Sequence, residues 1–319
     1  MTGRYIYDAE LTPIGASTFQ PTGFPDIGAA TFTRYEDGHE VDALLVESVQ
    51  SMANRLEATA WNQADNRPVD AVTGMPWVRV VRAKTGEFLT SSRLEAHRLA
   101  SPFVHTSILE GQSMFAVVGN RLGLTADTPL DYRAMAGAIA QLDPFCLVHG
   151  VFFSHRNWLG QPKFMRAISG VIEAHDVQRA VSGGRKSDRV RHQLDKDREG
   201  GTAEGYGSVP FSRTEWTAKR IIGSFVIDVE LLQSYGLPQP ATEALETLAL
   251  WEIRNLFEGG LRLRTACDLE LASPVTARRG PELSSADELT SALQDLVAKS
   301  DGAFGDGEAI TVEWSGKKG

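Results

Sequence analysis

The sequence lacks the features that define several specialised classes of protein. It holds 2 cysteines among 319 residues, Cys146 and Cys267, without partners at metal-ligand spacing, which is typical of a reducing cytoplasm. The longest apolar stretch, from Cys146 to Phe153, is far shorter than the roughly 18 residues that a membrane helix needs. The N-terminal residues carry no charged-then-apolar leader pattern. We therefore expect a cytoplasmic protein with no membrane partner.

Recognisable catalytic motifs are also missing: there is no P-loop, no nucleophile elbow and no paired-carboxylate motif. Cys146 and His149 are expected to face opposite sides of an apolar strand, so they do not predict a zinc site with His155. We expect no metal and no cofactor. Two residues keep an enzyme open as an alternative, His175 as a general acid without an evident partner and Asp26 as a carboxylate in an ordered loop.

Basic residues do not outnumber acidic ones, since 32 Lys and Arg accompany 41 Asp and Glu, for a net charge of −9. The charge is nevertheless uneven, because residues 151–220 carry 13 basic and 8 acidic side chains. Salt limits the reach of each charge to roughly 8–10 Å, so a locally basic segment can bind a polyanion on an acidic protein. The net charge therefore does not exclude a nucleic-acid site.

A hydrophobic content of 42% is enough to form a core, and the apolar patterns predict an order of elements. They predict a strand at 43–46, a helix at 49–60, strands at 144–154 and 164–177, a helix between Pro240 and Gly259, and a strand at 261–271. This order is that of the ferredoxin-like split βαβ fold, whose open sheet face commonly binds RNA. Further predicted elements are strands at 76–81, 221–229 and 309–314 and a helix at about 284–299.

The loop from Gln20 to Gly28 combines two prolines with two glycines. Glycine permits conformations in which successive backbone N–H groups point to one side, and such a nest binds phosphate oxygens. Gln20, Thr22 and Gly23 are therefore candidate phosphate-binding residues. From spacing alone, a plain rigid turn is the simpler explanation of this loop.

The start of the first predicted helix offers several donors together. Ser48, Gln50 and Ser51 lie where free N–H groups and the helix dipole attract anions. Asn54 and Arg55 follow one turn later, and Arg55 shares a helix face with Ser51. A phosphate group could bind here, but an N-cap with a surface arginine paired to a glutamate is the simpler interpretation.

The most basic segment surrounds Gly183 and Gly184, where five basic side chains accompany one aspartate: Arg179, Arg185, Lys186, Arg189 and Arg191. The stretch 176–207 is rich in glycine and charge, so we expect it to project from the core, either solvated or along a phosphate backbone. Arg262 and Arg264 point to one side of the strand predicted at 261–271, where pairing with acidic residues is the alternative to phosphate binding.

Four segments together resemble a known family: FQPTGFPDIGAA (19–30), LVESVQSMANRLEA (45–58), GEFLTSSRLEAHRLASPFV (86–104) and LWEIRNLFEGGLRLRTACDLE (250–270). They resemble the backbone subunit of the type I-G (formerly I-U) CRISPR effector complex, over roughly residues 10–272. The loop at 20–28 also resembles Pro-x-Gly-x-Pro-Asp loops in backbone subunits of other type I systems. The C-terminal residues carry little of the resemblance.

The resemblance implies an α+β fold with a modified ferredoxin-like, RRM-like core of the RAMP superfamily. We place an RNA-binding palm at 1–175 and 208–272, with an insertion around 86–130, a thumb at 176–207, and a C-terminal extension packed on the palm at 273–319. The implied RNA-binding residues are Gln20, Thr22, Gly23, Ser48, Gln50, Ser51, Asn54, Arg55, Arg93, His175, Arg179, Arg185, Lys186, Arg189, Arg191, Arg262 and Arg264.

The function implied is that of a non-catalytic scaffold. In such families, copies stack head to tail along the CRISPR RNA and grip its backbone, a thumb displaces about every sixth base, and base pairing reads the target. The implied partners are CRISPR RNA, further copies of the chain, the guide-end-capping and large subunits of the Cascade complex, and target DNA through the guide. Two alternatives remain, a metal-dependent ribonuclease that cuts target RNA through Asp26 and a guide-processing ribonuclease that uses His175.

Overall fold

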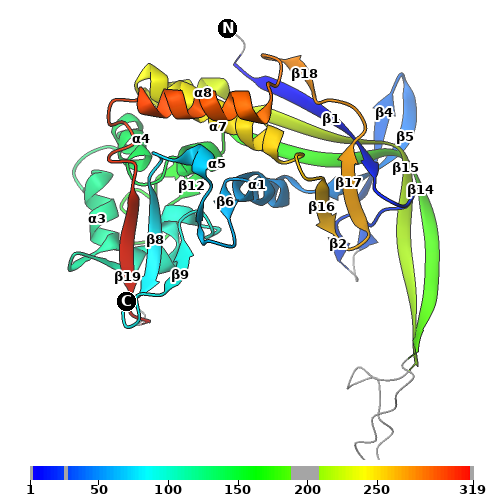
Figure 1. The fold of residues 1–319 in the computed structure, drawn as a ribbon, viewed down its shortest axis with the longest axis horizontal. Helices are drawn as coiled ribbons and strands as arrows, with labels where there is room; N and C mark the ends of the chain where they lie inside the picture. The colour runs from blue at the N-terminus through cyan, green and yellow to red at the C-terminus, as the bar shows by residue number, and fades with distance from the viewer. Residues whose placement is uncertain (1–2, 25–27, 188–207, 317–319) are drawn as a thin grey trace, which may run out of the picture.

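The computed structural model describes residues 3–24, 28–187 and 208–316. Its fold class is α+β, as predicted, with a large antiparallel sheet, a smaller second sheet and helices between and around them (Figure 1). In the part of the chain that is described, no helix is both long enough and apolar enough to cross a membrane.

The larger sheet has the strand order β16-β17-β1-β15-β14-β5-β4, and β18 also pairs with β1. Neighbouring strands in it are antiparallel. The strands are β1 (Tyr5–Pro13), β4 (Thr31–Glu36), β5 (His39–Glu47), β14 (Ile168–Ser187), β15 (Ser208–Ile227), β16 (Leu261–Arg264), β17 (Cys267–Leu271) and β18 (Thr276–Arg279).

Four central strands, in the order β17-β1-β15-β14, have the ferredoxin-like arrangement. Helix α1 (Val49–Ala58) lies between β1 and β14 in sequence, and α7 (Gln239–Asn255) lies between β15 and β17. Both helices contact the sheet and each other. Each helix thus joins two strands that are separated by one antiparallel strand, which is the split βαβ unit and confirms the predicted fold class.

The stretch 144–154 was wrongly assigned as a strand, whereas the strand predicted at 43–46 is present but was given the wrong place in the core. The stretch 144–154 forms helix α5 (Phe145–His149) and the short β12 (Val151–Phe152), because α5 is buried on all sides and such a run has no periodicity that separates helix from strand. The strand expected at 43–46 is the end of β5, which pairs with β4 at the edge of the sheet. The first core strand is instead β1, where every second side chain from Tyr7 to Leu11 is buried.

The second sheet has the order β11-β10-β19-β8-β9 and forms a separate lobe. Its strands are β8 (Trp77–Arg82), β9 (Phe88–Ser91), β10 (Ile108–Leu109), β11 (Gln112–Ser113) and β19 (Ala309–Trp314). β19 pairs in parallel with β8, and α8 (Ala286–Ala298) packs against α7. The strands predicted at 76–81 and 309–314 and the helix predicted at 284–299 are therefore confirmed.

The remaining elements are short and complete the two lobes. They are β2 (Gly23–Phe24), β3 (Gly28–Ala29), β6 (Trp61–Asn62), β7 (Arg67–Pro68), β13 (Lys163–Phe164), α2 (Pro102–His105), α3 (Met114–Arg121), α4 (Tyr132–Ala140), α6 (Val229–Ser234) and the 3-10 turns Asp70–Val72 and Arg98–Ala100.

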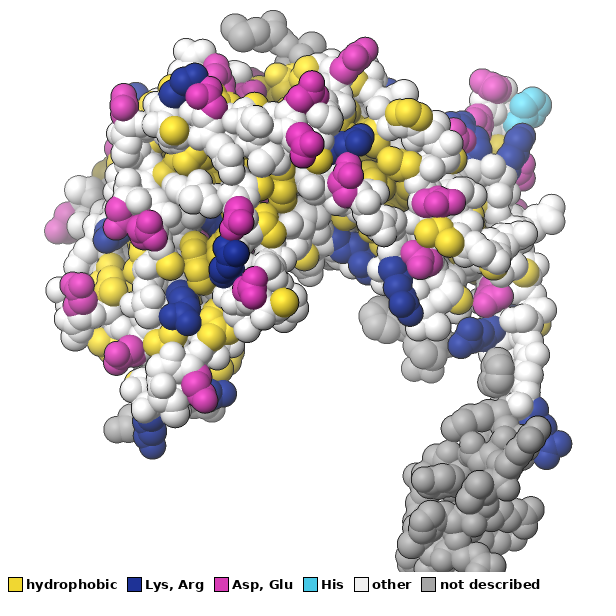
Figure 2. All heavy atoms as spheres, viewed as in Figure 1, with side chains coloured by type: hydrophobic (Ala, Val, Ile, Leu, Met, Phe, Trp, Pro, Cys, Tyr) yellow, Lys and Arg dark blue, Asp and Glu magenta, His cyan; other side chains and the backbone are white. Residues whose placement is uncertain are grey.

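β14 and β15 continue beyond the sheet as a long hairpin, paired as far as Ser187 and Ser208. β14 pairs with β5 only up to His175, and Asp176 has a φ of +54°, a left-handed conformation that is unusual without glycine. The hairpin turns away from the sheet, and Figure 2 shows a hollow between it and the second lobe, with Lys and Arg side chains on both flanks. Of the predicted thumb, residues 176–187 belong to β14 and residues 188–207 lie outside the described part of the chain.

Candidate nucleic-acid interface

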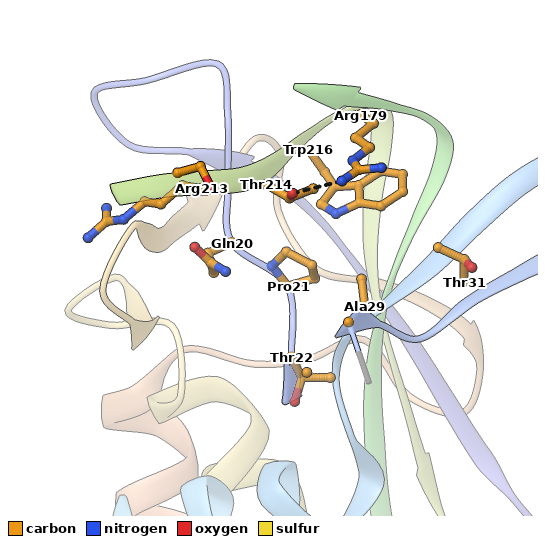
Figure 3. Close-up of a pocket in the computed structure, with 12 residues that line it drawn as sticks. Gln20, Pro21, Thr22, Ala29, Thr31, Arg179, Arg213, Thr214 and Trp216 are labelled. Carbon is orange, nitrogen blue, oxygen red and sulfur yellow. Dashed lines mark hydrogen bonds between the residues drawn. The ribbon is translucent and has the colours of Figure 1, made fainter. Parts of the chain in front are cut away.

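A groove of about 660 Å³ lies at the root of the hairpin, between the β14–β15 strands and the chain at 20–31 (Figure 3). Three of the predicted RNA-binding residues from the first loop, Gln20, Thr22 and Gly23, line it together with Arg179 from β14. The other lining residues are Pro21, Gly28, Ala29, Thr31, Ser212, Arg213, Thr214 and Trp216. The fold therefore brings two of the predicted segments, far apart in sequence, to one concave surface.

Trp216 provides the aromatic surface of this groove. Its backbone is fixed by two hydrogen bonds with Phe19, each 2.9 Å, so the hairpin is joined to the loop at this position. Its side chain is only partly buried, and in Figure 3 the guanidinium of Arg179 lies beside the indole. Arg179 also donates to the hydroxyl of Thr214 at 3.1 Å. An indole face beside a guanidinium is a surface on which bases of any sequence can stack.

The loop at 20–24 differs from the predicted phosphate nest. The backbone N–H of Gln20 donates to Ala266 at 2.8 Å and that of Thr22 donates to Val46 at 3.1 Å, so both are used inside the protein. Gly23 is required by space, because a Cβ there would lie 2.4 Å from the carbonyl oxygen of Gly28. Gln20 and Thr22 thus line the groove with their side chains, while Asp26 lies outside the described residues.

The start of α1 corresponds to the simpler of the two predicted interpretations. The side chain of Ser48 is the N-cap and accepts from the backbone N–H of Ser51 at 3.3 Å. The hydroxyl of Ser51 donates to Glu47, as does Nε of Arg55 at 3.0 Å. Gln50 and Asn54 are exposed on the same helix. Ser48 thus caps the helix, and the hydroxyl proton of Ser51 is used on Glu47 and not on an anion.

Glu47 is the centre of a larger cluster, which we call the Glu47 cluster: Glu47, Ser51, Arg55 and Arg264. Arg264 donates to Glu47 and, through one terminal nitrogen, to the carbonyl oxygens of Gln20 (3.2 Å) and Val46 (3.0 Å). Arg55 donates to the carbonyl oxygens of Arg262 (3.3 Å) and Leu263 (2.6 Å). The cluster joins β5, α1, β16 and the loop that borders the groove.

Two predicted RNA-binding residues have structural roles instead. The side chain of Arg93 is 1% exposed, lies 3.5 Å from Asp143 and has its guanidinium 3.8 Å from the ring centre of Phe145. Burial lowers the pKa of Arg93, an effect that Asp143 opposes. Arg93 also donates to the carbonyl oxygens of Met75 and Pro76. The prediction of an RNA contact is wrong because the guanidinium is enclosed inside the second lobe, and the local sequence does not reveal that burial.

His175 is the second correction. It is 8% exposed, and its ring lies against the guanidinium of Arg34 on one side and 3.5 Å from Glu173 on the other. Burial lowers the pKa of His175, and Arg34 lowers it further, so the imidazole is neutral near pH 7. The ring is thus enclosed at the junction of hairpin and sheet, where Arg34 and Glu173 occupy its two nitrogens.

The other predicted basic residues lie in β14, in β16 or outside the described residues. Arg185 is exposed far along the hairpin, Arg262 is exposed on the edge strand β16, and Lys186 lies in β14 near its end. Arg189 and Arg191 lie outside the described residues. Trp216, Thr214 and Glu47 were missed. A lone tryptophan in the polar run SRTEWTAKR was the one signal for Trp216, whereas Glu47 looked like any charged residue at a strand end.

No group of three or more His, Cys, Asp or Glu residues that could hold a metal ion occurs within residues 3–24, 28–187 and 208–316. Both cysteines are buried thiols, and burial raises the pKa of Cys267 to about 11. The groove itself is lined mainly by an indole, guanidinium groups and neutral polar side chains.

The model of one protein family, described as CRISPR-associated protein GSU0053, matches residues 6–179. This match spans more than half of the chain, and the chain belongs to this CRISPR-associated family. The matched range ends at Arg179, inside β14, so Trp216 and Arg264 lie beyond it. No curated protein matches the sequence.

Two solved structures are distantly similar to the chain. One, described as a CRISPR RNA-guided surveillance complex, pre-nicking, contains a chain with 10% sequence identity and a TM-score of 0.42, and the match covers 92% of this chain and 88% of the other. The other is Csc2 of Thermofilum pendens, with 10% identity and a TM-score of 0.33, covering 95% of this chain and 77% of Csc2.

Proposed function

We propose that the chain is a non-catalytic backbone subunit of a type I-G CRISPR effector complex that binds CRISPR RNA along its sugar-phosphate backbone. The observation that carries this proposal is the groove at the hairpin root, where Trp216, Arg179 and the loop at 20–23 meet, in a chain of a CRISPR-associated family. A subunit of this kind must bind guides of any sequence, so it needs contacts to base faces, ribose and phosphate rather than to base edges.

The lining of the groove matches these needs. The indole of Trp216 can stack on any base, since every base has a π-face. The guanidinium groups of Arg179 and Arg213 are charged at all relevant pH values and can contact phosphate oxygens. The amide of Gln20 and the hydroxyls of Thr22 and Thr31 can exchange hydrogen bonds with the ribose 2′-hydroxyl, which distinguishes RNA from DNA.

In this proposal several copies assemble head to tail along one guide, next to the guide-end-capping and large Cascade subunits, and base pairing with the guide selects target DNA. A repeated head-to-tail contact joins two different surfaces of the chain. The uneven charge supports it, since residues 151–220 carry a net charge of +5 in a protein whose total is −9. DNA cleavage would then depend on a recruited nuclease.

The test is to purify the chain from cells that express a CRISPR array and to sequence the RNA that it retains. We expect guide-length CRISPR RNA and equal affinity of the RNA-free chain for single-stranded RNAs of unrelated sequence. An RNA-free protein with no affinity for single-stranded RNA would overturn the proposal.

The non-catalytic part has its own test. The chain with bound guide is incubated with complementary RNA and with precursor RNA, in the presence of magnesium or manganese, and we expect both RNAs to remain intact. Cleavage that is lost in Asp26→Ala or His175→Ala, but not in Trp216→Ala, would show an enzyme instead.

A further inference from the structure

Glu47 is a fully buried carboxylate, 0% exposed, that lies between two arginines at the border of the groove. We propose that Glu47 is a positioning residue, which holds the guanidinium groups of Arg55 and Arg264 as a preformed pair for one phosphate group of the RNA. This inference rests on the proposed function and assigns a residue and a subsite within it.

The charge of the Glu47 cluster supports anion binding. Two guanidinium groups accompany one carboxylate, so the cluster keeps one positive charge. The neighbouring thiol of Cys267 adds no negative charge near neutral pH, because burial raises its pKa to about 11. Without the carboxylate, two cations this close together would repel each other and turn toward water. Glu47 thus permits the pair to form without cancelling its charge.

The hydrogen bonds of the cluster leave donors for a ligand. A guanidinium has five N–H donors in a rigid plane. Arg55 uses three of them, on Glu47 and two carbonyl oxygens, and Arg264 uses three on Glu47, Gln20 and Val46 and also interacts with the thiol of Cys267. The side chains of Arg55 and Arg264 remain 27% and 25% exposed. Planar donors held at a partly open surface fit the bidentate geometry of a phosphate group.

The cluster is also coupled to the groove. Arg264 donates to the carbonyl oxygen of Gln20, and the next residues, Pro21 and Thr22, line the same groove. If Glu47 no longer held Arg264, both the guanidinium and this part of the loop would lose a fixed position. The phosphate subsite and the base-stacking surface of Trp216 are therefore parts of one nucleotide-binding surface.

The first test is Glu47→Gln, with affinity measured by fluorescence anisotropy of a labelled oligouridylate at several salt concentrations. If Glu47 acted only through its own charge, this substitution would raise RNA affinity, because it removes a negative charge beside the RNA. A positioning role predicts the opposite, a loss of affinity. If Glu47 positions the arginines, affinity falls by about tenfold, as expected for one charge-assisted contact. The slope of log affinity against log salt also becomes shallower by about 0.7 for a lost phosphate contact. The matched control, Glu270→Gln, changes an exposed glutamate on the neighbouring strand β17 and leaves affinity unchanged or slightly higher.

A second variant keeps the test decisive if Glu47→Gln does not fold. Arg264→Lys preserves the charge of a partly exposed side chain but removes the planar fork that reaches Glu47, Gln20 and Val46 together. We expect the same loss of affinity, while Arg279→Lys on the distant strand β18 has no effect. Circular dichroism melts confirm that each variant is folded at the temperature of measurement.

A double-mutant cycle separates positioning from other effects. In a protein that already carries Arg55→Gln and Arg264→Gln, Glu47→Gln should cause no further loss of affinity. Unchanged or tighter binding by Glu47→Gln and Arg264→Lys in the otherwise native chain would overturn the inference and leave the proposed function intact. A folded native chain that binds no oligouridylate would overturn the proposed function itself.

Discussion

Buried carboxylates hold arginines in two contrasting ways in this chain. Where the second lobe packs against the ferredoxin-like core, Arg98 pairs with Glu57 of helix α1 at 2.7 Å and Arg93 lies beside Asp143, with all four side chains at most 8% exposed. In the Glu47 cluster one carboxylate serves two arginines whose side chains are about a quarter exposed. The first arrangement is balanced in charge and closed to water, whereas the second has excess positive charge and faces solvent.

This difference separates the enclosed, structural arginines from the two that we propose bind phosphate. Removing a charge from water costs several kcal/mol, so a buried arginine persists only where a carboxylate and hydrogen bonds compensate it. Arg98 has both, with two bonds to Glu57 and one to the carbonyl oxygen of Gly150. An arginine that keeps free donors at the surface can exchange water for phosphate oxygens instead. The same residue types therefore have different roles, decided by exposure and by the ratio of charges.

The largest expected effect comes from breaking a balanced pair. Asp143→Ala leaves the guanidinium of Arg93 enclosed without its carboxylate, and we expect the free energy of unfolding to fall by about 3–5 kcal/mol. Urea denaturation measures this loss. Asp295→Ala, which breaks an exposed pair with Lys299, serves as the control. The RNA affinity of folded Asp143→Ala should equal that of the native chain. A loss of affinity without a loss of stability would mean that the Arg93–Asp143 pair also takes part in RNA binding.

Trp216→Ala should weaken RNA binding and leave the stability of the fold nearly unchanged. Loss of one stacked base costs roughly 1–3 kcal/mol of RNA binding, which corresponds to an affinity weaker by about 5- to 150-fold. Stability should change little by comparison, because the side chain is only partly buried. The salt dependence of binding should stay the same, since no charge is removed, and Trp216→Phe should restore most of the affinity. Equal affinity of the alanine variant and the native chain would exclude Trp216 as a stacking residue.

A third buried pair tests the closed region through pH. His149 and Glu252 are 2.8 Å apart and sealed from solvent, and burial lowers the pKa of His149 to about 3 and raises that of Glu252. A carboxyl with a raised folded pKa stabilises the protein at low pH, and this contribution is lost as the pH rises above its unfolded pKa of about 4.5.

The native chain should therefore lose stability relative to Glu252→Gln as the pH rises from 5 to 8, by up to about 1.4 kcal/mol per pH unit. Urea unfolding at each pH measures the difference between the two proteins. A difference that stays constant over this range would mean that Glu252 is ionised in the folded protein.

The smallest effect on stability is expected from an ion pair that is mostly exposed to solvent. Asp176 and Lys219 face each other across the hairpin at 4.0 Å, with side chains 60% and 74% exposed. Lys219→Ala should change the free energy of unfolding by less than about 0.5 kcal/mol. A larger loss in urea denaturation would mean that the hairpin junction depends on this contact, and that exposure alone does not rank the ion pairs of this chain.

Local patterns predicted much of the fold but not the roles of the arginines. Helix α7 follows from its prolines and apolar spacing, and β19 from an apolar run near the end. Residues 144–154 were assigned incorrectly because a helix and a strand look alike when every side chain is buried. The local sequence gives no sign that Arg93 and Arg98 are buried and that Arg55 is partly exposed. Only tertiary packing separates them.

The residues of the candidate site could be predicted only where a local sequence pattern marks them. Gln20, Thr22 and Arg179 were found because glycine-rich and basic segments are visible locally. Their meeting place depends on the pairing of β14 with β15, which sets Trp216 opposite Arg179 from 37 positions away in the chain. Such long-range pairing leaves no trace in the local sequence of either strand.

The parallel pairing of β19 with β8 has a consequence for handling this protein. β8 carries the sequence WVRVVR, and β19 covers its full length on one side. A chain cut before Ala309 would expose the backbone of an apolar strand along a new edge, and such edges recruit strands from other molecules. C-terminal truncation is therefore expected to yield insoluble protein, even though the hairpin and its groove lie at the opposite end of the molecule.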